Sequence, residues 1–205
     1  MGVNRYVSEA KNWVLASHNK GKIKEISDLL ARRGIVLRSA ADFSLPEPDE
    51  TENSFEGNAL LKARTACAAT GLPTLADDSG LCVAALGGQP GIHSARWAGE
   101  PRDFDRAMKK VQDGLEATGQ DDRSAAFVCV LALALPDGSH RFYEGRVEGE
   151  IVWPPRGDHG FGYDPIFRPE GESRVFAEMS SVEKAGLSHR ARAMSKLMSA
   201  EFGDE

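Results

Sequence analysis

Cysteine is scarce in this sequence, and none of it is arranged for a disulfide framework or a zinc site. Cys67, Cys82 and Cys129 lie in apolar contexts and form no C-x-x-C pair. Disulfide-rich domains pair their cysteines, and structural zinc sites space theirs closely. We therefore interpret these residues as buried free thiols, which is typical of a protein of the reducing cytoplasm.

A long hydrophobic run is also missing. The longest apolar stretch, at residues 125–135, is far shorter than the ~20 residues with which a helix spans a bilayer. The N-terminus has no basic segment followed by an apolar one, and Tyr6 stands where a myristoylation motif needs Ser or Thr. With a mean hydropathy of −0.37, the chain is expected to be a soluble protein without a membrane partner.

The third thing that the sequence lacks is an excess of positive charge. Its formal net charge is −6, whereas binding to DNA or RNA needs an electropositive surface. We therefore expect no nucleic-acid partner. A small anionic substrate stays compatible with this charge, because a local cluster of lysine and arginine side chains suffices to bind it.

What the sequence does contain is an alternation of helical and strand-like segments over 205 residues, without repeats or a long linker. Hydrophobic periodicity predicts helices at 22–33, 54–71, 103–117 and 181–202. Short apolar runs predict strands at 13–17, 35–40, 73–78, 81–86, 124–135 and 141–153. The last two are expected to form a hairpin. This pattern predicts an α/β or α+β fold with a mixed sheet.

Two adjacent carboxylates interrupt the apolar segments near the middle of the chain. In TLADDSGLCV, residues 74–83, Asp77 and Asp78 follow one apolar run, and a Ser-Gly pair precedes the next. A turn between two strands would explain one aspartate at this place. A second carboxylate at the end of a buried strand indicates that a metal ion is bound or a proton is moved.

Two further segments place charge at predicted helix starts. SHNKGK, residues 17–22, joins a strand to a helix whose N-terminus favours an anion, although a plain strand–helix connection would look similar. The loop before the second helix holds Asp49, Glu50 and Glu52, with Lys62 behind them. Acidic loops are usually just solvated. Together with the aspartate pair, however, this loop could complete a Mg²⁺ site, which uses one or two carboxylates plus substrate phosphates.

A glycine-rich aromatic loop follows the predicted hairpin. In HGFGYDPIF, residues 159–167, Phe161 and Tyr163 offer ring faces, and Asp164 precedes a proline. A nucleotide base could stack on such a loop while the aspartate or the loop backbone bonds its edge. The alternative is an aromatic loop that packs on the core.

The last predicted helix carries a cationic cluster. Lys184, His189 and Arg190 have offsets that do not align on one helical face. A helix break near residues 186–188 would let them reach one site, and a surface cluster is the alternative.

These segments together resemble one family closely, the Ham1/RdgB-type inosine triphosphate pyrophosphatases. That family's signature segments are matched, in order and spacing, by LASHNKGKIKEI, SFEGNALLKA, LADDSGLCVAALGGQPGIHSARWAG, HGFGYDPIF and EKAGLSHRARAM. The resemblance covers residues 13–202. The sequence departs from the family at His18, where a small residue is usual, and at Gly57, where many members carry Glu.

The resemblance implies the fold and the activity. The expected fold is α/β, with two lobes around a long central mixed β-sheet and a deep nucleotide cleft. It would form a single domain over residues 1–205, with residues 1–12 as an N-terminal extension. The expected enzyme is a cytoplasmic homodimer that hydrolyses ITP, dITP and XTP with Mg²⁺, through attack of water on the α-phosphorus, to a monophosphate and pyrophosphate.

The resemblance also implies roles for individual residues. Asp78 would bind Mg²⁺ and help to activate the water, Asp77 would support it, and Glu50 would be the second metal ligand. The residues expected to bind the substrate are Ser17, His18, Asn19, Lys20, Gly21, Lys22, Lys62, Ser79, Phe161, Gly162, Tyr163, Asp164, Lys184, His189 and Arg190.

Two rival interpretations remain. A nucleotide-binding protein without turnover would keep the phosphate and base loops, but it would need no pair like Asp77 and Asp78. A Maf-like pyrophosphatase would act on other modified nucleotides. The Phe-Gly-Tyr-Asp and Ser-His-Arg segments favour the inosine-type enzyme instead.

Overall fold

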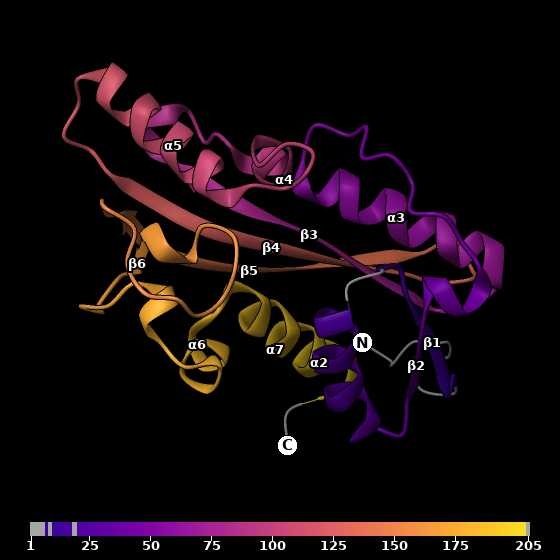
Figure 1. Ribbon diagram of the computed structural model, residues 1–205. Coiled ribbons are helices and arrows are strands. Elements are labelled where there is room, and N and C mark those ends of the chain that lie inside the picture. The colour runs from indigo at the N-terminus through magenta and orange to yellow at the C-terminus, as the bar shows by residue number, and fades with distance from the viewer. Residues whose placement is uncertain (1–6, 8–9, 18–19, 204–205) are drawn as a thin grey trace. The chain divides into compact units, whose positions relative to one another are not determined.

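The chain folds around one mixed β-sheet (Figure 1), seen in a computed structural model that describes residues 7, 10–17 and 20–203. The strands are β1 (Asn12–Leu15), β2 (Val36–Ser39), β3 (Thr74–Val83), β4 (Ser124–Ala134), β5 (His140–Ile151) and β6 (Phe167–Pro169). Their order in the sheet is β2-β1-β3-β4-β5-β6. β1 pairs in parallel with β2 and β3, whereas β5 and β6 are antiparallel. The predicted α/β class with a mixed sheet is confirmed.

The helices are interspersed with the strands as the alternating sequence pattern predicts. The α-helices are α2 (Lys20–Ala31), α3 (Phe55–Thr70), α4 (Ser94–Trp97), α5 (Phe104–Thr118), α6 (Ser181–Leu187) and α7 (His189–Phe202). Short 3-10 helices are η1 (Ala40–Phe43), η2 (Ala84–Leu86), η3 (Gly91–His93), η4 (Asp164–Ile166) and η5 (Phe176–Glu178). None of the helices in the described part of the chain is long and apolar enough to cross a membrane.

Internal contacts divide the chain into two compact units. Unit 1 comprises residues 1–78, 130–144 and 193–205, and unit 2 comprises residues 79–129 and 145–192. The first boundary therefore falls inside β3, directly after Asp78.

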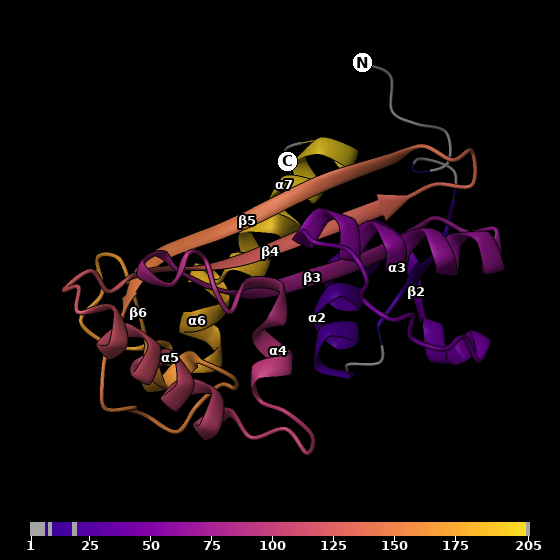
Figure 2. The ribbon, with the colours of Figure 1, turned by 90° about the horizontal axis from the view of Figure 1, so that it is seen from above.

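In unit 1, α3 lies on one side of the strands, and α2 lies on the other side with the C-terminal part of α7 (Figures 1 and 2). α3 begins at Ser54, whose hydroxyl accepts a hydrogen bond from the N–H of Gly57 over 3.0 Å. It ends at Gly71, whose φ of 68° suits a residue without a side chain. Both predicted ends of this helix are confirmed.

The end of α7 is fixed to β5 by a buried carboxylate. Glu201, in the last turn of α7, accepts hydrogen bonds from the Arg141 guanidinium and the Tyr143 hydroxyl of β5. Burial, followed by the hydrogen bond to Glu201, raises the pKa of Tyr143, so the phenol stays a donor over the physiological range. Phe202 completes the contact, with its ring 6.0 Å from the ring of buried Trp13.

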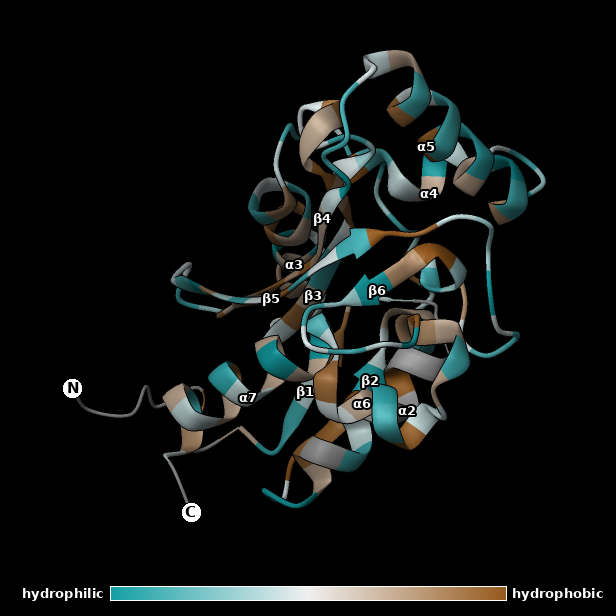
Figure 3. Cartoon of the chain, turned by 90° about the vertical axis from the view of Figure 1, so that its left-hand side faces the viewer, coloured by the Kyte–Doolittle hydropathy of each residue, from teal (hydrophilic) through white to brown (hydrophobic). Residues whose placement is uncertain are grey.

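Unit 2 is built on an amphipathic helix and an aromatic cluster. α5 begins at Asp103, whose carboxylate accepts from the N–H of Arg106 over 3.1 Å. Its apolar side, visible against its hydrophilic side in Figure 3, packs into a core with Phe127 of β4. The ring of Phe127 lies 4.6 Å from that of Phe167 and 5.9 Å from that of Phe176, centroid to centroid. These rings belong to the hydrophobic core of unit 2.

Two differences from the sequence prediction bear on the site. The predicted strand–turn–strand at residues 73–86 is wrong, because β3 runs unbroken from Thr74 to Val83. The strand lies between β1 and β4 in the sheet, and the N–H of Leu81 donates to the Ser94 hydroxyl over 2.9 Å. A Cβ at Gly80 would collide with Ser94 and with the carbonyl of Gly91, so glycine permits this close approach.

The other difference concerns the last predicted helix, which is two helices. α6 ends at Leu187, Ser188 is extended with φ −69° and ψ 151°, and α7 begins at His189. The alternative of a helix break near residues 186–188 is thereby confirmed.

Candidate functional site

Two buried carboxylates lie in β3, just beyond the end of its neighbour β1. β1 ends at Leu15, which pairs with Leu75, so Asp77 and Asp78 extend past the last paired residue of β1. Their exposed fractions are 3% and 6%. Successive side chains of a strand point to opposite faces, so the two carboxylates leave the backbone in different directions. Each carboxylate can therefore contact groups that the other does not reach.

α3 supplies the groups that meet these carboxylates. Asn58 is completely buried and donates from Nδ2 to Oδ2 of Asp78 over 3.1 Å. One turn later, Nζ of Lys62 forms an ion pair with Oε1 of Glu50 over 2.6 Å. Unit 1 thus gathers polar side chains from β3, α3 and the acidic loop.

The charge state of Lys62 follows from these neighbours. Burial alone would lower the pKa of its ammonium group, but the hydrogen bond to Glu50 and the charges of Asp77 and Asp78 outweigh burial and raise it. Lys62 is therefore positively charged at neutral pH. Placed among three carboxylates, it supplies a fixed positive charge toward which an anionic substrate can be drawn.

The donor set of unit 1 fits a magnesium ion. Carboxylate oxygens are the ligands that Mg²⁺ prefers, and its sites typically combine one or two of them with substrate phosphates. Asp78 and Glu50 offer such oxygens, and both are already oriented, by Asn58 and Lys62 respectively. Within the described residues, no three His, Cys, Asp or Glu side chains gather closely enough to hold a metal unaided.

The predicted phosphate loop is described in part. Ser17 follows β1 and is buried, with 7% of its surface exposed. His18 and Asn19 lie outside the described residues. Residues 20–22 form the first turn of α2, while the positions of their side chains lie outside what is described. Free backbone N–H groups at this helix start are suited to an anion.

In unit 2, a buried ion pair shapes the glycine-rich loop. Asp164, 2% exposed, accepts from the N–H of Phe161 over 2.8 Å and pairs with Lys184 of α6. The ammonium group of Lys184 also lies 4.9 Å from the Phe161 ring centroid. Gly160 has φ 76°, and a Cβ there would collide with Asp164. The loop is thus held in one shape, with the Phe161 ring 63% exposed.

The two rings that the sequence offered as stacking surfaces lie in different environments. Tyr163 is 3% exposed, its hydroxyl donates to the Ser94 carbonyl over 2.8 Å, and its ring meets Phe104 edge-on at 5.6 Å. Burial raises the pKa of Tyr163, so its hydroxyl stays protonated. Gly162, between the two rings, has φ 70°. Of the pair, Phe161 alone presents a ring face to solvent.

The break at Ser188 places the cationic residues around one aromatic cluster. Lys184, at the end of α6, has its ammonium group 5.4 Å from the Phe176 ring centroid. His189, at the start of α7, stacks on Phe127 with centroids 5.0 Å apart and planes 13° from parallel. Arg190 follows and is half-buried. Ser79, the first residue of unit 2 in the sequence, is half-buried as well.

Comparison with known proteins assigns the family. A model described as "Ham1 family" matches residues 13–200. This chain belongs to the Ham1 family. The Ham1 relative from Gluconobacter oxydans, named dITP/XTP pyrophosphatase, is 54% identical over 194 residues, which is 95% of this chain and 92% of that protein. A protein of the same name from Caulobacter vibrioides is 57% identical over 189 residues, covering 92% and 97% of the two chains.

Solved structures agree with this assignment. A HAM1 protein from Coxiella burnetii matches with a TM-score of 0.89 and 43% identity, over 92% of this chain and 97% of that one. A Mycobacterium abscessus structure titled "Nucleoside-triphosphatase / dITP/XTP pyrophosphatase" matches with a TM-score of 0.78 and 43% identity, over 91% and 98% of the two chains. The Ham1 resemblance inferred from the signature segments is therefore confirmed.

Sequence reasoning missed two polar residues that hold these Ham1 segments in place. Asn58 contacts Asp78, and Ser94 joins Leu81 to Tyr163 through its hydroxyl and its carbonyl. Asn58 carried a signal, because it lies one helical turn before Lys62 and thus on the same face of α3. Ser94 carried none, since it lies in a segment for which the sequence predicted neither a helix nor a strand.

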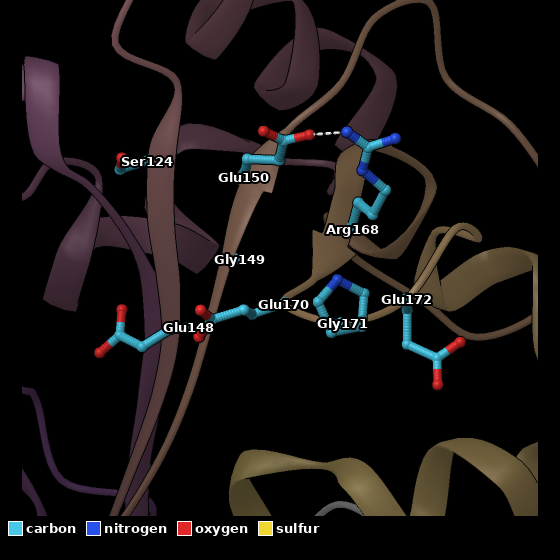
Figure 4. A pocket seen from close by; sticks show the side chains of 9 residues that line it. Ser124, Glu148, Gly149, Glu150, Arg168, Glu170, Gly171 and Glu172 are labelled. Atoms are coloured by element: carbon cyan, nitrogen blue, oxygen red, sulfur yellow. Dashed lines mark hydrogen bonds and ion pairs between the residues drawn. The ribbon is translucent and has the colours of Figure 1, made fainter.

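A separate pocket on unit 2 contains none of the predicted site residues (Figure 4). Its volume is about 440 Å³, and its walls carry Glu148, Glu150, Arg168, Glu170 and Glu172. Arg168 pairs with Glu150 across it, and both side chains are partly exposed.

Proposed function

We propose that this chain hydrolyses dITP, ITP and XTP to the monophosphate and pyrophosphate, which removes deaminated purines from the nucleotide pool. The observation that carries the proposal is the 54% identity, over 95% of the chain, to a protein named dITP/XTP pyrophosphatase. The buried pair of Asp77 and Asp78 supports turnover rather than binding alone. A protein that only binds a nucleotide needs no carboxylate to activate water.

In the proposed reaction, Asp78 accepts a proton from the water whose oxygen attacks the α-phosphorus. A new P–O bond forms as the bond from the α-phosphorus to the bridging oxygen breaks, and pyrophosphate leaves. Asn58 holds Oδ2 of Asp78 and so fixes the direction of this carboxylate. Lys62 stays charged and offsets the charge that develops on the phosphates. Asp77 supports Asp78 by acting on the same lysine.

Magnesium is the cation that we propose for this site, with Asp78 and Glu50 as protein ligands. When bound, it would supply positive charge to the phosphate oxygens and so stabilise the transition state. Ser17, His18 and Asn19 are proposed to contact the phosphates, together with the N-terminus of α2, which is suited to an anion. Ser79 and Arg190 are proposed as further contacts to the nucleotide.

The base is proposed to bind to unit 2. Phe161 offers an exposed ring for stacking, and Lys184 stands next to it. Asp164 is engaged by the Phe161 N–H and by Lys184, so we assign it the role of fixing the loop. The N–H groups of this loop, with His189 and Arg190, are the proposed donors to the base edge.

Hydrogen-bond donors to the base edge would select hypoxanthine and xanthine over adenine and guanine. Hypoxanthine and xanthine carry a 6-oxo acceptor, where adenine has an amino donor. Guanine shares the 6-oxo group, but its 2-amino group would meet steric crowding or an opposed donor. A buried polar group left unpaired by the wrong base can discriminate by up to ~10⁴–10⁵.

A substrate panel tests the proposed function. With Mg²⁺ and detection of pyrophosphate, kcat/KM for dITP, ITP and XTP should exceed that for ATP and GTP at least ~100-fold, a gap of ~2.7 kcal/mol. Excess chelator should abolish turnover, because carboxylates and phosphates would otherwise repel. Comparable values for ATP or GTP would contradict the proposed selectivity, and pyrophosphate release in full chelator would contradict the metal requirement.

The assembly, extent and location of the enzyme are also proposals. Residues 13–200 match the family model, and we infer a single catalytic domain with residues 1–12 as an extension. We also infer a cytoplasmic homodimer, following the family resemblance. Light scattering on the purified protein would test the dimer.

A further inference from the structure

The buried amide of Asn58 joins two parts of unit 1. The residue lies in the first turn of α3 and has no exposed surface. Its Nδ2 donates to Oδ2 of Asp78 over 3.1 Å, and its Oδ1 accepts from the backbone N–H of Glu52 over 3.0 Å. One side chain therefore connects the proposed catalytic base to the acidic loop.

The two partners fix which way this amide faces. A backbone N–H can only donate, so the Glu52 N–H must meet the amide oxygen. An ionised carboxylate can only accept, so Asp78 must meet the amide nitrogen. Turning the amide of Asn58 over would oppose two donors at one end and two acceptors at the other.

A second contact holds the same loop to the same helix. Lys62 lies one turn after Asn58, on the same face of α3, and binds Glu50 over 2.6 Å. Glu50 and Glu52 belong to one short segment, so these two contacts fix that segment jointly. The position of Glu50 and the direction of Asp78 are thus coupled through α3.

We propose that Asn58 is a positioning residue for Asp78, which it aligns with the attacking water and with the loop that carries Glu50. The proposal rests on the proposed function, in which Asp78 activates the water. Holding one carboxylate oxygen keeps the other in the direction that the reaction needs, and a misplaced base loses rate without losing substrate. Asp77, Asp78 and Glu50 all act on the charge of Lys62, so Asp78 belongs to a group of charged side chains in unit 1.

Two variants distinguish the roles of the two hydrogen bonds that the Asn58 amide makes, one to Asp78 and one to the Glu52 N–H. Asn58→Asp keeps an acceptor oxygen for the Glu52 N–H but removes the donor to Asp78, whereas Asn58→Ala removes both. For each, kcat should fall ~10- to 100-fold, and KM for dITP should stay within ~3-fold of wild type. Only Asn58→Ala should speed hydrogen exchange at the Glu52 amide, measured without nucleotide or magnesium.

A matched control lies in unit 2. Gln112 is a buried amide whose Nε2 donates to the Glu116 carboxylate over 2.7 Å and whose Oε1 accepts from Arg123 over 2.7 Å. Gln112→Glu makes the same chemical change as Asn58→Asp, next to a carboxylate that has no proposed role. Its kcat should match wild type. Thermal melts of every variant check that each protein is folded at the temperature at which kcat is measured.

A double-mutant cycle decides whether Asn58 acts through Asp78. In an Asp78→Asn background, Asn58→Ala should lower kcat by less than ~3-fold, because the group that it positions is already gone. An equal fold loss in both backgrounds would overturn the proposal, and so would an unchanged kcat in Asn58→Asp. A wild-type protein that fails to release pyrophosphate from dITP would count against the proposed function instead, before any variant is made.

Discussion

Each unit holds a lysine next to a buried carboxylate, but the surroundings of the two ammonium groups differ. Lys62 lies among Asp77, Asp78 and Glu50, all of which act on its charge. Lys184 pairs with Asp164 and otherwise faces aromatic rings. The first arrangement suits a polyanion that arrives with a divalent cation. The second suits a flat, uncharged group, because one carboxylate balances the lysine and a ring is left exposed.

The largest effect is expected where the carboxylates are concentrated. Asp78→Asn keeps the shape of the side chain but removes the proton acceptor, so kcat for dITP should fall ~10²–10⁴-fold. KM should change far less, because Lys62 and the helix start of α2 remain. Steady-state kinetics checks this, with the exposed Asp113→Asn on α5 as the control. A kcat near that of wild type would show that Asp78 is not the base.

A smaller effect is expected in unit 2, where the ring of Phe161 is exposed and that of Tyr163 is not. Phe161→Ala should raise KM for dITP with little change in kcat, because loss of one base–aromatic stack typically costs ~1–3 kcal/mol. Tyr163→Phe, the matched variant, should leave KM unchanged and cost ~0.5–1.5 kcal/mol of stability through its lost bond to Ser94. Kinetics and thermal melts separate the two. Equal rises in KM would refute the assignment of stacking to Phe161.

The smallest effect concerns the helix that carries Lys184. Hydrogen bonds from the N–H and hydroxyl of Ser180, and then from Arg174, lower the pKa of Glu183 from 4.5 to about 2. The stability that Glu183 adds is therefore present above pH 4.5 and is lost as the pH falls toward about 2. The melting temperature of Glu183→Gln should lie slightly below wild type at neutral pH and converge with it in acid. Glu170→Gln, at an exposed position, should show no such convergence.

Much of the fold followed from the sequence because local chemistry decides it. Ser54 and Gly71 bound α3 through a hydroxyl cap and a left-handed φ, both of which are properties of single residues. β3 was missed because its continuation depends on pairing within the sheet, where β3 lies between β1 and the distant strand β4. Asp-Asp-Ser-Gly is a turn-like string, and tertiary contacts overrode it.

In the candidate site, too, some features follow from the local sequence and others depend on tertiary contacts. Asp77 and Asp78 stood out from the sequence because they interrupt apolar runs, whereas the roles expected of Lys62 and Lys184 came from the family resemblance. The burial of Tyr163 could not be foreseen, since a tyrosine in a glycine-rich loop has equal reason to face solvent or core. Which residue orients which carboxylate depends on distances such as the one between Asn58 and Asp78, and a single sequence does not contain them.

The carboxylate of Glu201 sets a limit on how the protein can be handled. It lies next to the C-terminal end of the chain, yet it is buried and bonded to Arg141 and Tyr143. Most chain ends tolerate trimming, because their last residues contact nothing. Here, a truncation that removed Glu201 would leave a buried phenol without its acceptor and β5 without the end of α7. Affinity tags and fusions therefore have to leave the last turn of α7 intact.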